Sequence, residues 1–322
     1  MSAIRLYALA PTKTPRPTRT PLPSATPSPT LTATRDVSPT RLYTVTPTKP
    51  RRSTERSPQR STPQRSAPTP SAPTPSDTPT VTDTPAPVVR TARVPILMYH
   101  HIGDLPPDAD AIRKSLTVSQ ERFEEQMRFL AAQGYTTIHL VDLVTHLQTG
   151  APLPAKPIIL TFDDGYDDNY VNVFPTLKDF GFKGTFFVIG APTDYGSPGY
   201  LRWEQILEMY DNGMEIGAHS LTHRYNLGTT RPSTQDAEIK QAHALMTGHL
   251  ANWIPLFSYP SGSYNQYSID LLKQLGYIGA ATTKQGALQS SAKLFELRRI
   301  RIRGEWNMQQ FLYWFNYWTA QP

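Results

Sequence analysis

Short apolar runs typical of buried strands alternate with amphipathic segments typical of helices from Val94 to Trp318. We expect strands near 94–99, 135–139, 157–162, 184–189, 214–217, 255–259, 277–280 and 297–302, and helices near 117–133, 141–147, 169–180, 203–212, 234–250, 267–275 and 308–318. Alternation of this kind implies parallel strands joined by crossover helices. So many repeats favour a closed barrel over an open sheet, and such barrels carry their chemistry at the carboxyl ends of the strands.

Residues 1–88 have a different composition from the rest of the chain. Of the 32 prolines, 19 lie before Val88, among many Thr and Ser residues. Such a segment has too little apolar area to offset the entropy lost on ordering. We therefore expect a disordered Pro/Thr/Ser-rich stalk or linker at 1–88 and one large folded domain at 89–322.

The charge divides at the same point. Before Val88 there are 12 Lys and Arg against 4 Asp and Glu, whereas the remainder carries 20 against 22. The basic stalk suits contact with an anionic envelope polymer or lipid surface, and the alternative is a merely soluble linker. The folded part has no basic excess, which argues against a nucleic-acid substrate.

Several features bear on cellular location. Cysteine is absent, so neither disulfides nor thiol chemistry are expected. No apolar run is long enough to be a transmembrane segment. Residues 1–10 end in Ala8-Leu9-Ala10, which resembles the cleavage site of a signal sequence. The run is either the remnant of a truncated signal sequence or a coincidence. Because Ser/Thr/Pro stalks are chiefly a feature of exported proteins, we expect an extracellular or cell-surface protein.

Two motifs at predicted strand ends can build one metal site. Thr161-Phe162-Asp163-Asp164-Gly165 ends an apolar run, and His219-Ser220-Leu221-Thr222-His223 follows another. Two imidazoles and one carboxylate make three protein ligands and leave a fourth position for water on a zinc-like ion. The second carboxylate is then free to act as a base, as metal-assisted hydrolysis requires. Separately, the aspartates fit a solvated loop and the histidines a polar turn.

These motifs, together with the Tyr-Pro-x-Gly loop at Tyr259, resemble those of the polysaccharide deacetylases (chitooligosaccharide deacetylase homology domain, carbohydrate esterase family 4). The run from Val94 to Ile102 resembles the start of the subgroup that includes poly-N-acetylglucosamine deacetylases. The resemblance implies a distorted barrel of about seven parallel strands, one divalent metal ion, most commonly Zn²⁺, and an N-acetylated polysaccharide substrate.

Site residues follow from the resemblance position by position. It implies that Asp163 is the catalytic base and that Asp164, His219 and His223 bind the metal. It also implies that Tyr259, Pro260 and Ser261 lie in a loop whose Ser261 N–H helps to hold the oxyanion. The alternative for this loop is a plain turn at the end of a strand.

Two departures from the family pattern affect the catalytic assignment. The third motif usually begins with an Arg that pairs with the catalytic Asp, but this chain has Phe257-Ser258 there, so Arg299 is the candidate substitute. The alternative is that the arginines of that segment form an exposed strand face. The usual late His is also absent, which leaves His100 or His101 as a proton donor, or no dedicated acid at all. A structural role is the alternative for His100.

The remaining histidines and aromatic residues are expected to serve structure. We interpret His243 and His249 as surface or packing residues. The last helix and the segment before it are rich in aromatic residues, and most of these should pack the helix on the barrel. Trp306 is the one we consider as a platform for a sugar ring. The aromatic residues concerned are Trp306, Phe311, Tyr313, Trp314, Phe315, Tyr317 and Trp318.

Together the observations predict a metal-dependent hydrolase that removes N-acetyl groups from a GlcNAc-containing polysaccharide such as poly-GlcNAc, peptidoglycan or a chitin-like polymer. An O-acetyl esterase acting on xylan or a similar glycan is the enzymatic alternative. A glycan-binding surface protein with impaired catalysis is the alternative from another class.

Overall fold

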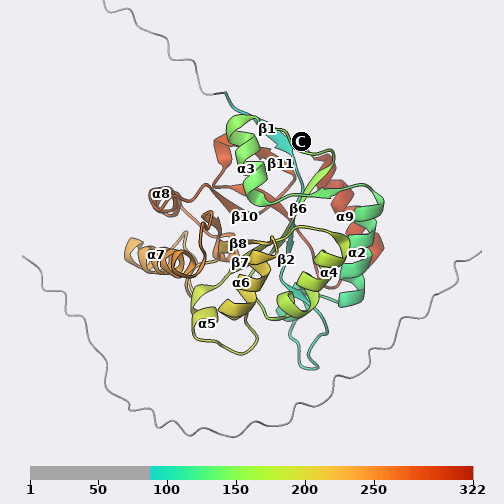
Figure 1. Cartoon of the computed structure of the whole chain (residues 1–322), viewed down its shortest axis with the longest axis horizontal. Coiled ribbons are helices and arrows are strands. Elements are labelled where there is room, and N and C mark those ends of the chain that lie inside the picture. Colours follow the sequence, from blue (N-terminus) through green and yellow to red (C-terminus); the bar gives the residue numbers. More distant parts are fainter. Residues whose placement is uncertain (1–87, 322) are drawn as a thin grey trace, which may run out of the picture. The chain divides into compact units, whose positions relative to one another are not determined.

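The computed structural model describes residues 88–321 (Figure 1). The predicted stalk and the signal remnant at 1–10 lie outside the described residues, except for Val88. Seven parallel strands close into a ring in the order β2-β12-β10-β9-β8-β7-β6, and β6 pairs back with β2. The predicted α/β barrel is confirmed. The strands are β2 (Ile96–Tyr99), β6 (Pro157–Phe162), β7 (Thr185–Val188), β8 (Glu215–Ala218), β9 (Leu256–Ser258), β10 (Gly279–Gln285) and β12 (Leu297–Arg301).

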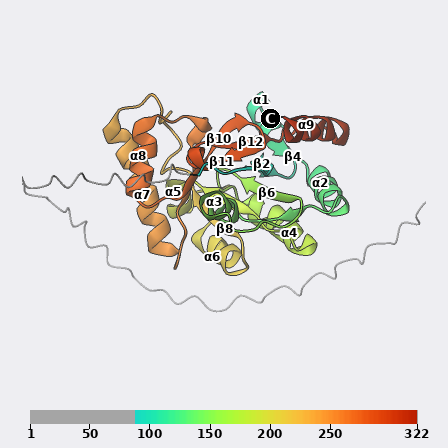
Figure 2. The same cartoon turned by 90° about the horizontal axis from the view of Figure 1, so that it is seen from above.

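Helices surround the strands, as two views at right angles show (Figures 1 and 2). Most follow a strand and return the chain to the amino end of the next one, as expected of crossover connections. They are α1 (Ala111–Leu116), α2 (Gln120–Ala132), α3 (Leu140–Thr149), α4 (Phe174–Phe180), α5 (Gly190–Asp194), α6 (Trp203–Asp211), α7 (Pro232–His249), α8 (Gln266–Gln274) and α9 (Met308–Ala320).

Smaller elements complete the domain. β1 pairs antiparallel with β11, β3 pairs with β4, and β5 extends the sheet beside the first residues of β6. These strands are β1 (Thr91–Arg93), β3 (His101–Ile102), β4 (Thr117–Val118), β5 (Thr136–Thr137) and β11 (Leu288–Ser290). Single turns of helix are η1 (Asn169–Val173), η2 (Pro260–Gly262) and η3 (Ser291–Lys293).

The barrel interior is closed at the amino ends of its strands by α3. Leu140, Leu143 and Val144 of α3 belong to the same apolar cluster as Ile96 and Leu297 from the strands. The carboxylate of Glu215, the first residue of β8, accepts hydrogen bonds from the backbone N–H of Leu140 and of Val141 at 2.9 and 3.1 Å. This carboxylate satisfies two N–H groups that a helix start leaves without partners. The amino ends of the barrel interior are therefore filled by α3, and the carboxyl ends are left for side chains that bind a substrate within the barrel mouth.

Element boundaries differ from the sequence-based prediction at a few points. The helix expected near 117–133 begins only at Gln120, because Thr117 belongs to β4 and Ser119 caps α2 by accepting from the N–H of Arg122. The predicted strand at 135–139 contracts to the two residues of β5. Within residues 88–321, no helix is long and apolar enough to cross a membrane.

Candidate metal centre

The two adjacent aspartates follow β6 at a sharp turn. The N–H of Asp163 still donates a strand-type hydrogen bond to the carbonyl of Tyr99, at 2.9 Å. Asp164 has a φ of 76° and Gly165 a φ of 71°, a left-handed conformation that costs energy for a residue with a side chain. This turn stops the strand alternation, so both carboxylates remain on the same side of the barrel mouth. Both are buried, with exposed fractions of 2 and 6%.

The two histidines come from the end of β8 and the turn that follows. His219 Nδ1 lies 2.7 Å from the carbonyl oxygen of Ser258, which accepts its proton and leaves the lone pair on Nε2. Ser220 Oγ accepts from the N–H of His223 at 3.0 Å, and both residues have a positive φ, of 64° and 57°. The turn brings the second imidazole back toward the first, with ring centroids 4.8 Å apart.

Asp164, His219 and His223 converge on one point. Asp164 Oδ1 lies 3.3 Å from His219 Nε2 and 3.7 Å from His223 Nε2. For a tetrahedral zinc site with bonds of about 2.05 Å, the ligand atoms stand roughly 3.3 Å apart. Asp164 Oδ1 is also buried and has no hydrogen-bond partner among the described residues. The donor set, the spacing and the unpartnered oxygen all fit a divalent cation.

Asp163 does not join this group but is held by Arg299. The guanidinium donates from NH1 to Oδ1 and from NH2 to Oδ2, both at 2.7 Å, and the arginine is fully buried. Burial alone would raise the pKa of Asp163, but the charges of Arg299 and His219 hold it below its usual value. The carboxylate is therefore ionised over the working pH range.

Arg299 is fixed by further acceptors. Its Nε donates to the carbonyl of Thr282 at 2.8 Å and its NH2 to Ser258 Oγ at 3.0 Å. Ser258 stands in the motif where the family pattern has an arginine. The structure thus brings an arginine to Asp163 from β12, and Arg299 is not on an exposed strand face.

The two neighbouring histidines after β2 have different surroundings. His101 Nδ1 lies 2.6 Å from Asp168 Oδ2, and its Nε2 lies 2.6 Å from Arg113 NH1, so both nitrogens are engaged. His100 Nδ1 is buried and unpartnered among the described residues. Burial lowers the pKa of His100 to about 4, although Asp164 and Asp163 act in the opposite direction. Of the two candidates, only His100 keeps a free nitrogen at the mouth.

The Tyr259 loop forms the wall beside the end of β9. Tyr259 is fully buried and stacks on Tyr264 with centroids 4.6 Å apart, and Pro260 is buried too. Ser261 is exposed and has a φ of 54°. At Gly262 a Cβ would lie 2.0 Å from Thr283 Oγ1, so only glycine fits. This strained, tightly packed loop is compatible with a positioned Ser261 N–H.

Sequence reasoning missed the tyrosine that follows Gly165. The ring of Tyr166 stacks on His101 at 3.4 Å between centroids and lies near Tyr200, at 5.4 Å. Burial and the Asp164 carboxylate raise the pKa of Tyr166. Its position directly after the Asp-Asp-Gly turn could have indicated that it lies beside the site.

Packing accounts for the other histidines and much of the final helix. His249 stacks on Trp203 at 3.9 Å, and His243 lies against Trp253 and Tyr277 at 5.6 and 5.4 Å. In α9, Phe311 and Phe315 are buried in the core, as predicted, whereas Tyr313 and Tyr317 are exposed. Trp306 is 9% exposed and stacks at 6.1 Å on Trp314. Trp318 is partly buried.

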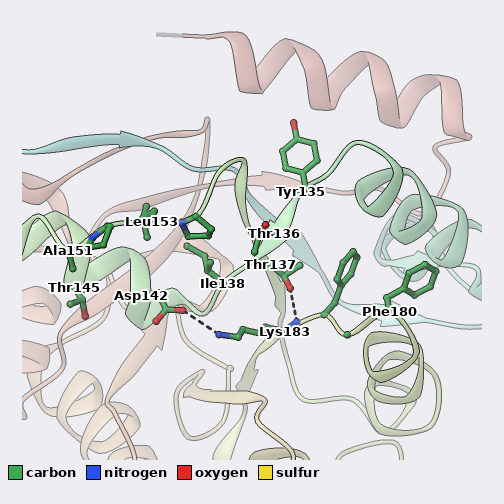
Figure 3. Close-up of a pocket in the computed structure, with 14 residues that line it drawn as sticks. Tyr135, Thr136, Thr137, Ile138, Asp142, Thr145, Ala151, Leu153, Phe180 and Lys183 are labelled. Carbon is green, nitrogen blue, oxygen red and sulfur yellow. Dashed lines mark hydrogen bonds and ion pairs between the residues drawn. The ribbon is translucent and has the colours of Figure 1, made fainter.

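A spacious hollow lies elsewhere in the domain. Figure 3 shows the residues that line it, from β5, the segment before β6 and the end of α4. Its volume is about 650 Å³. Thr136 of β5 pairs with Pro157, the first residue of β6, whereas the aspartates follow the last. The hollow therefore opens at the amino ends of the strands and contains none of the site residues.

Comparison with known proteins agrees with this geometry. The family model for polysaccharide deacetylases matches residues 150–280. A putative polysaccharide deacetylase of Bacillus subtilis (strain 168) is 32% identical over 213 residues, which are 66% of this chain and 72% of that protein. The chain therefore belongs to the polysaccharide deacetylase family and is a hydrolase of that class.

More distant relatives and solved structures extend the likeness. The poly-β-1,6-N-acetyl-D-glucosamine N-deacetylase of Escherichia coli (strain K12) is 23% identical over 255 residues, 67% of this chain and 37% of that protein. The structure of a Streptococcus pyogenes deacetylase in complex with acetate has a TM-score of 0.63 and 30% identity, covering 74% of this chain and 100% of that one. A polysaccharide deacetylase from Bacillus cereus has a TM-score of 0.60 and 27% identity, covering 70% and 69%.

Proposed function

We propose that this protein is a metal-dependent hydrolase that removes N-acetyl groups from a GlcNAc-containing polysaccharide. The convergence of Asp164, His219 and His223 on one point, with Asp164 Oδ1 left unpartnered, is the observation that carries the proposal. Zn²⁺ is the ion that two imidazoles and a carboxylate suit best. When bound, it would supply the charge that activates water and polarises the acetamide carbonyl.

Each remaining residue has a role in the reaction. Asp163 accepts the proton of the attacking water, and Arg299 holds its carboxylate in place. The Ser261 N–H, in the loop formed by Tyr259, Pro260 and Ser261, donates to the oxyanion that develops on the substrate. His100 relays the proton that Asp163 took from water to the leaving nitrogen, because both nitrogens of His101 are engaged elsewhere. The carbon–nitrogen bond then breaks to give acetate and a free amine.

The pairing of Arg299 with Asp163 argues against the reading as an impaired binding protein. A catalytic base must be ionised, and Arg299 holds the buried carboxylate of Asp163 in that form. Arg299, on β12, thus takes the place of the arginine that is absent from the third motif. The alternative function, an O-acetyl esterase, requires an experiment, because the same attack of water on the carbonyl carbon also hydrolyses an ester.

Acetate release tests the proposal directly. The purified protein, reconstituted with Zn²⁺, is incubated with poly-β-1,6-GlcNAc, peptidoglycan, chitooligosaccharides and acetylated xylan. We expect release from at least one N-acetylated glycan, with loss of release after chelation and in His223→Ala. Release from acetylated xylan alone would make the protein an esterase, and release from none of these glycans would refute the proposed activity.

We infer that the protein acts outside the cell, because Pro/Thr/Ser-rich segments are chiefly a feature of exported proteins. The basic composition of residues 1–88 suits contact with an anionic envelope polymer. Deleting residues 1–88 should leave activity on soluble oligomers unchanged and weaken retention on cell envelopes at low salt. Equal retention of both forms would rule out this contact.

A further inference from the structure

A second hollow lies at the rim of the barrel mouth, between the ends of β10 and β12 and the helix α9. Its volume is about 180 Å³, close to that of one sugar ring. Six side chains line it: Gln285, Arg301, Arg303, Trp306, Trp314 and Trp318. We call it the tryptophan hollow.

Aromatic rings make up half of the side chains that line this hollow. Trp306 and Trp314 lie nearly parallel, with centroids 6.1 Å and planes 13° apart. Three of the five tryptophans of the chain line the hollow. Trp314 and Trp318 remain partly exposed although they belong to an apolar helix. Rigid, amphipathic rings of this kind suit a ligand with one apolar and one polar face, as a pyranose has.

Two arginines add positive charge to the lining of the hollow. Arg303 lies 3.6 Å from Glu305, and this pair is about half exposed. Arg301 forms no ion pair within residues 88–321, and its Nε is buried without a hydrogen-bond partner. A guanidinium that is partly buried and unpaired loses hydration without compensation. Two hydrogen bonds to a bidentate anion would offset that loss.

Arg301 also connects the hollow with the catalytic groups. It stands two residues after Arg299 on β12, so the two side chains leave the strand on the same face. Arg299 reaches Asp163, and the charge of Arg301 acts on both Asp163 and His100. The hollow therefore lies beside the Arg299–Asp163 pair at the carboxyl ends of the strands.

The loop that shapes the hollow is held rigidly. Gly304 donates from its N–H to the carbonyl of Ser115 at 3.0 Å and accepts from Arg122 at 2.8 Å. A Cβ at Gly304 would lie 2.0 Å from the carbonyl oxygen of Thr117. A preorganised wall loses little entropy when a ligand binds.

We propose that the tryptophan hollow binds a sugar unit of the substrate that carries a carboxylate or a phosphate, with the ring against the tryptophans and the anion on Arg301. The inference rests on the proposed function and adds a substrate class to it. The preferred glycan is acidic as well as N-acetylated, and a neutral GlcNAc homopolymer leaves Arg301 unpaired.

Matched oligosaccharides test this proposal. They have equal length and are a neutral GlcNAc oligomer, an alternating oligomer of GlcNAc and N-acetylmuramic acid, its carboxyl-reduced form, and a phosphate-substituted GlcNAc oligomer. The readout is the ratio of kcat/KM for each acidic oligomer to that for its neutral counterpart. We expect a ratio of about ten or more for one of the two anions, from one charge-assisted hydrogen bond. The better anion identifies the source of the charge.

Variants assign the preference to the hollow. Arg301→Gln and Trp314→Ala should lower the ratio toward one, whereas Arg298→Gln, an exposed arginine on the same strand, should leave it unchanged. A wild-type ratio near one for both anions would overturn the proposal, as would equal loss in Arg298→Gln. If no oligomer releases acetate, the proposed function fails, but the proposal for the tryptophan hollow can still be tested by tryptophan fluorescence. Quenching by acidic and not by neutral oligomers would support it, and equal quenching or none would overturn it.

Discussion

Replacing Arg299 by Met tests the electrostatic design of the site most directly. The guanidinium is fully buried and makes both contacts to Asp163, whose carboxylate is itself 2% exposed. Met fills most of the volume but provides no charge. Among residues 88–321, Arg299→Met therefore leaves the buried carboxylate with only Ser258 Oγ, at 3.4 Å, as a side-chain donor.

The expected cost follows from that arrangement. Removing one partner of a buried ion pair destabilises a protein by about 3–5 kcal/mol, because the remaining charge stays desolvated. Asp163→Asn combined with Arg299→Met should recover at least roughly 2 kcal/mol of this, since the double variant buries no unpaired charge. The pKa of Asp163 lies below its ordinary value of 3.8 in the wild type. Its stabilising contribution is therefore present above that pH and lost as the pH falls, so the gap between wild type and Arg299→Met should narrow in acid.

Urea unfolding of chelator-treated protein, followed by circular dichroism, measures these differences without a contribution from bound metal. Arg298→Met is the matched control, because Arg298 is exposed on the same strand and should cost no more than about 0.5 kcal/mol. If Arg299→Met unfolds within about 1 kcal/mol of Arg298→Met, the pair with Asp163 does not stabilise the fold and the reasoning is refuted.

Three further outcomes are expected. Metal analysis should find about one ion per chain, and His219→Ala should lose both the ion and turnover; full occupancy in that variant would mean that the ligands are others. Asp163→Asn should keep the ion and lose about two to four orders of magnitude in rate, whereas Asp164→Asn should lose metal affinity first. The reverse pattern in acetate release and metal content would make Asp164 the base and Asp163 the metal ligand. Hydrogen bonds from Lys284 and Tyr264 lower the pKa of Glu296 to about 2. Lys284→Met should therefore reduce stability slightly near neutral pH and by less near pH 2, because that contribution is lost as the pH falls through this pKa. An equal reduction at both pH values, measured by thermal unfolding, would exclude the ion pair as its cause.

Local patterns were sufficient to predict the class of fold. Apolar runs such as 157–162 and amphipathic runs such as 120–132 have different periods, and each period reports the burial of a single element. The errors lie where an element is short. β5 has two residues and α5 has five, too few for a period to emerge, and tertiary contacts alone hold them in place.

The residues proposed to bind metal were also accessible from the sequence, because each motif is contiguous. Asp163 and Asp164 share one turn, and His219 and His223 share another. Their spacing within a turn limits where the side chains point, whatever the rest of the chain does. The convergence of the two turns needed only the rule that parallel strands end on the same side of a barrel.

What the sequence could not decide involves partners that are distant along the chain. Arg299 reaches Asp163 across 136 positions, and His219 finds the carbonyl of Ser258 across 39. The engagement of His101, which leaves His100 as the free neighbour, depends likewise on Asp168. Strand order and register create these contacts, and neither is encoded by any short window of residues. The sequence by itself therefore determined the element types and the candidate ligands, whereas only the closed barrel decided which charges meet, because side chains interact through distances in space.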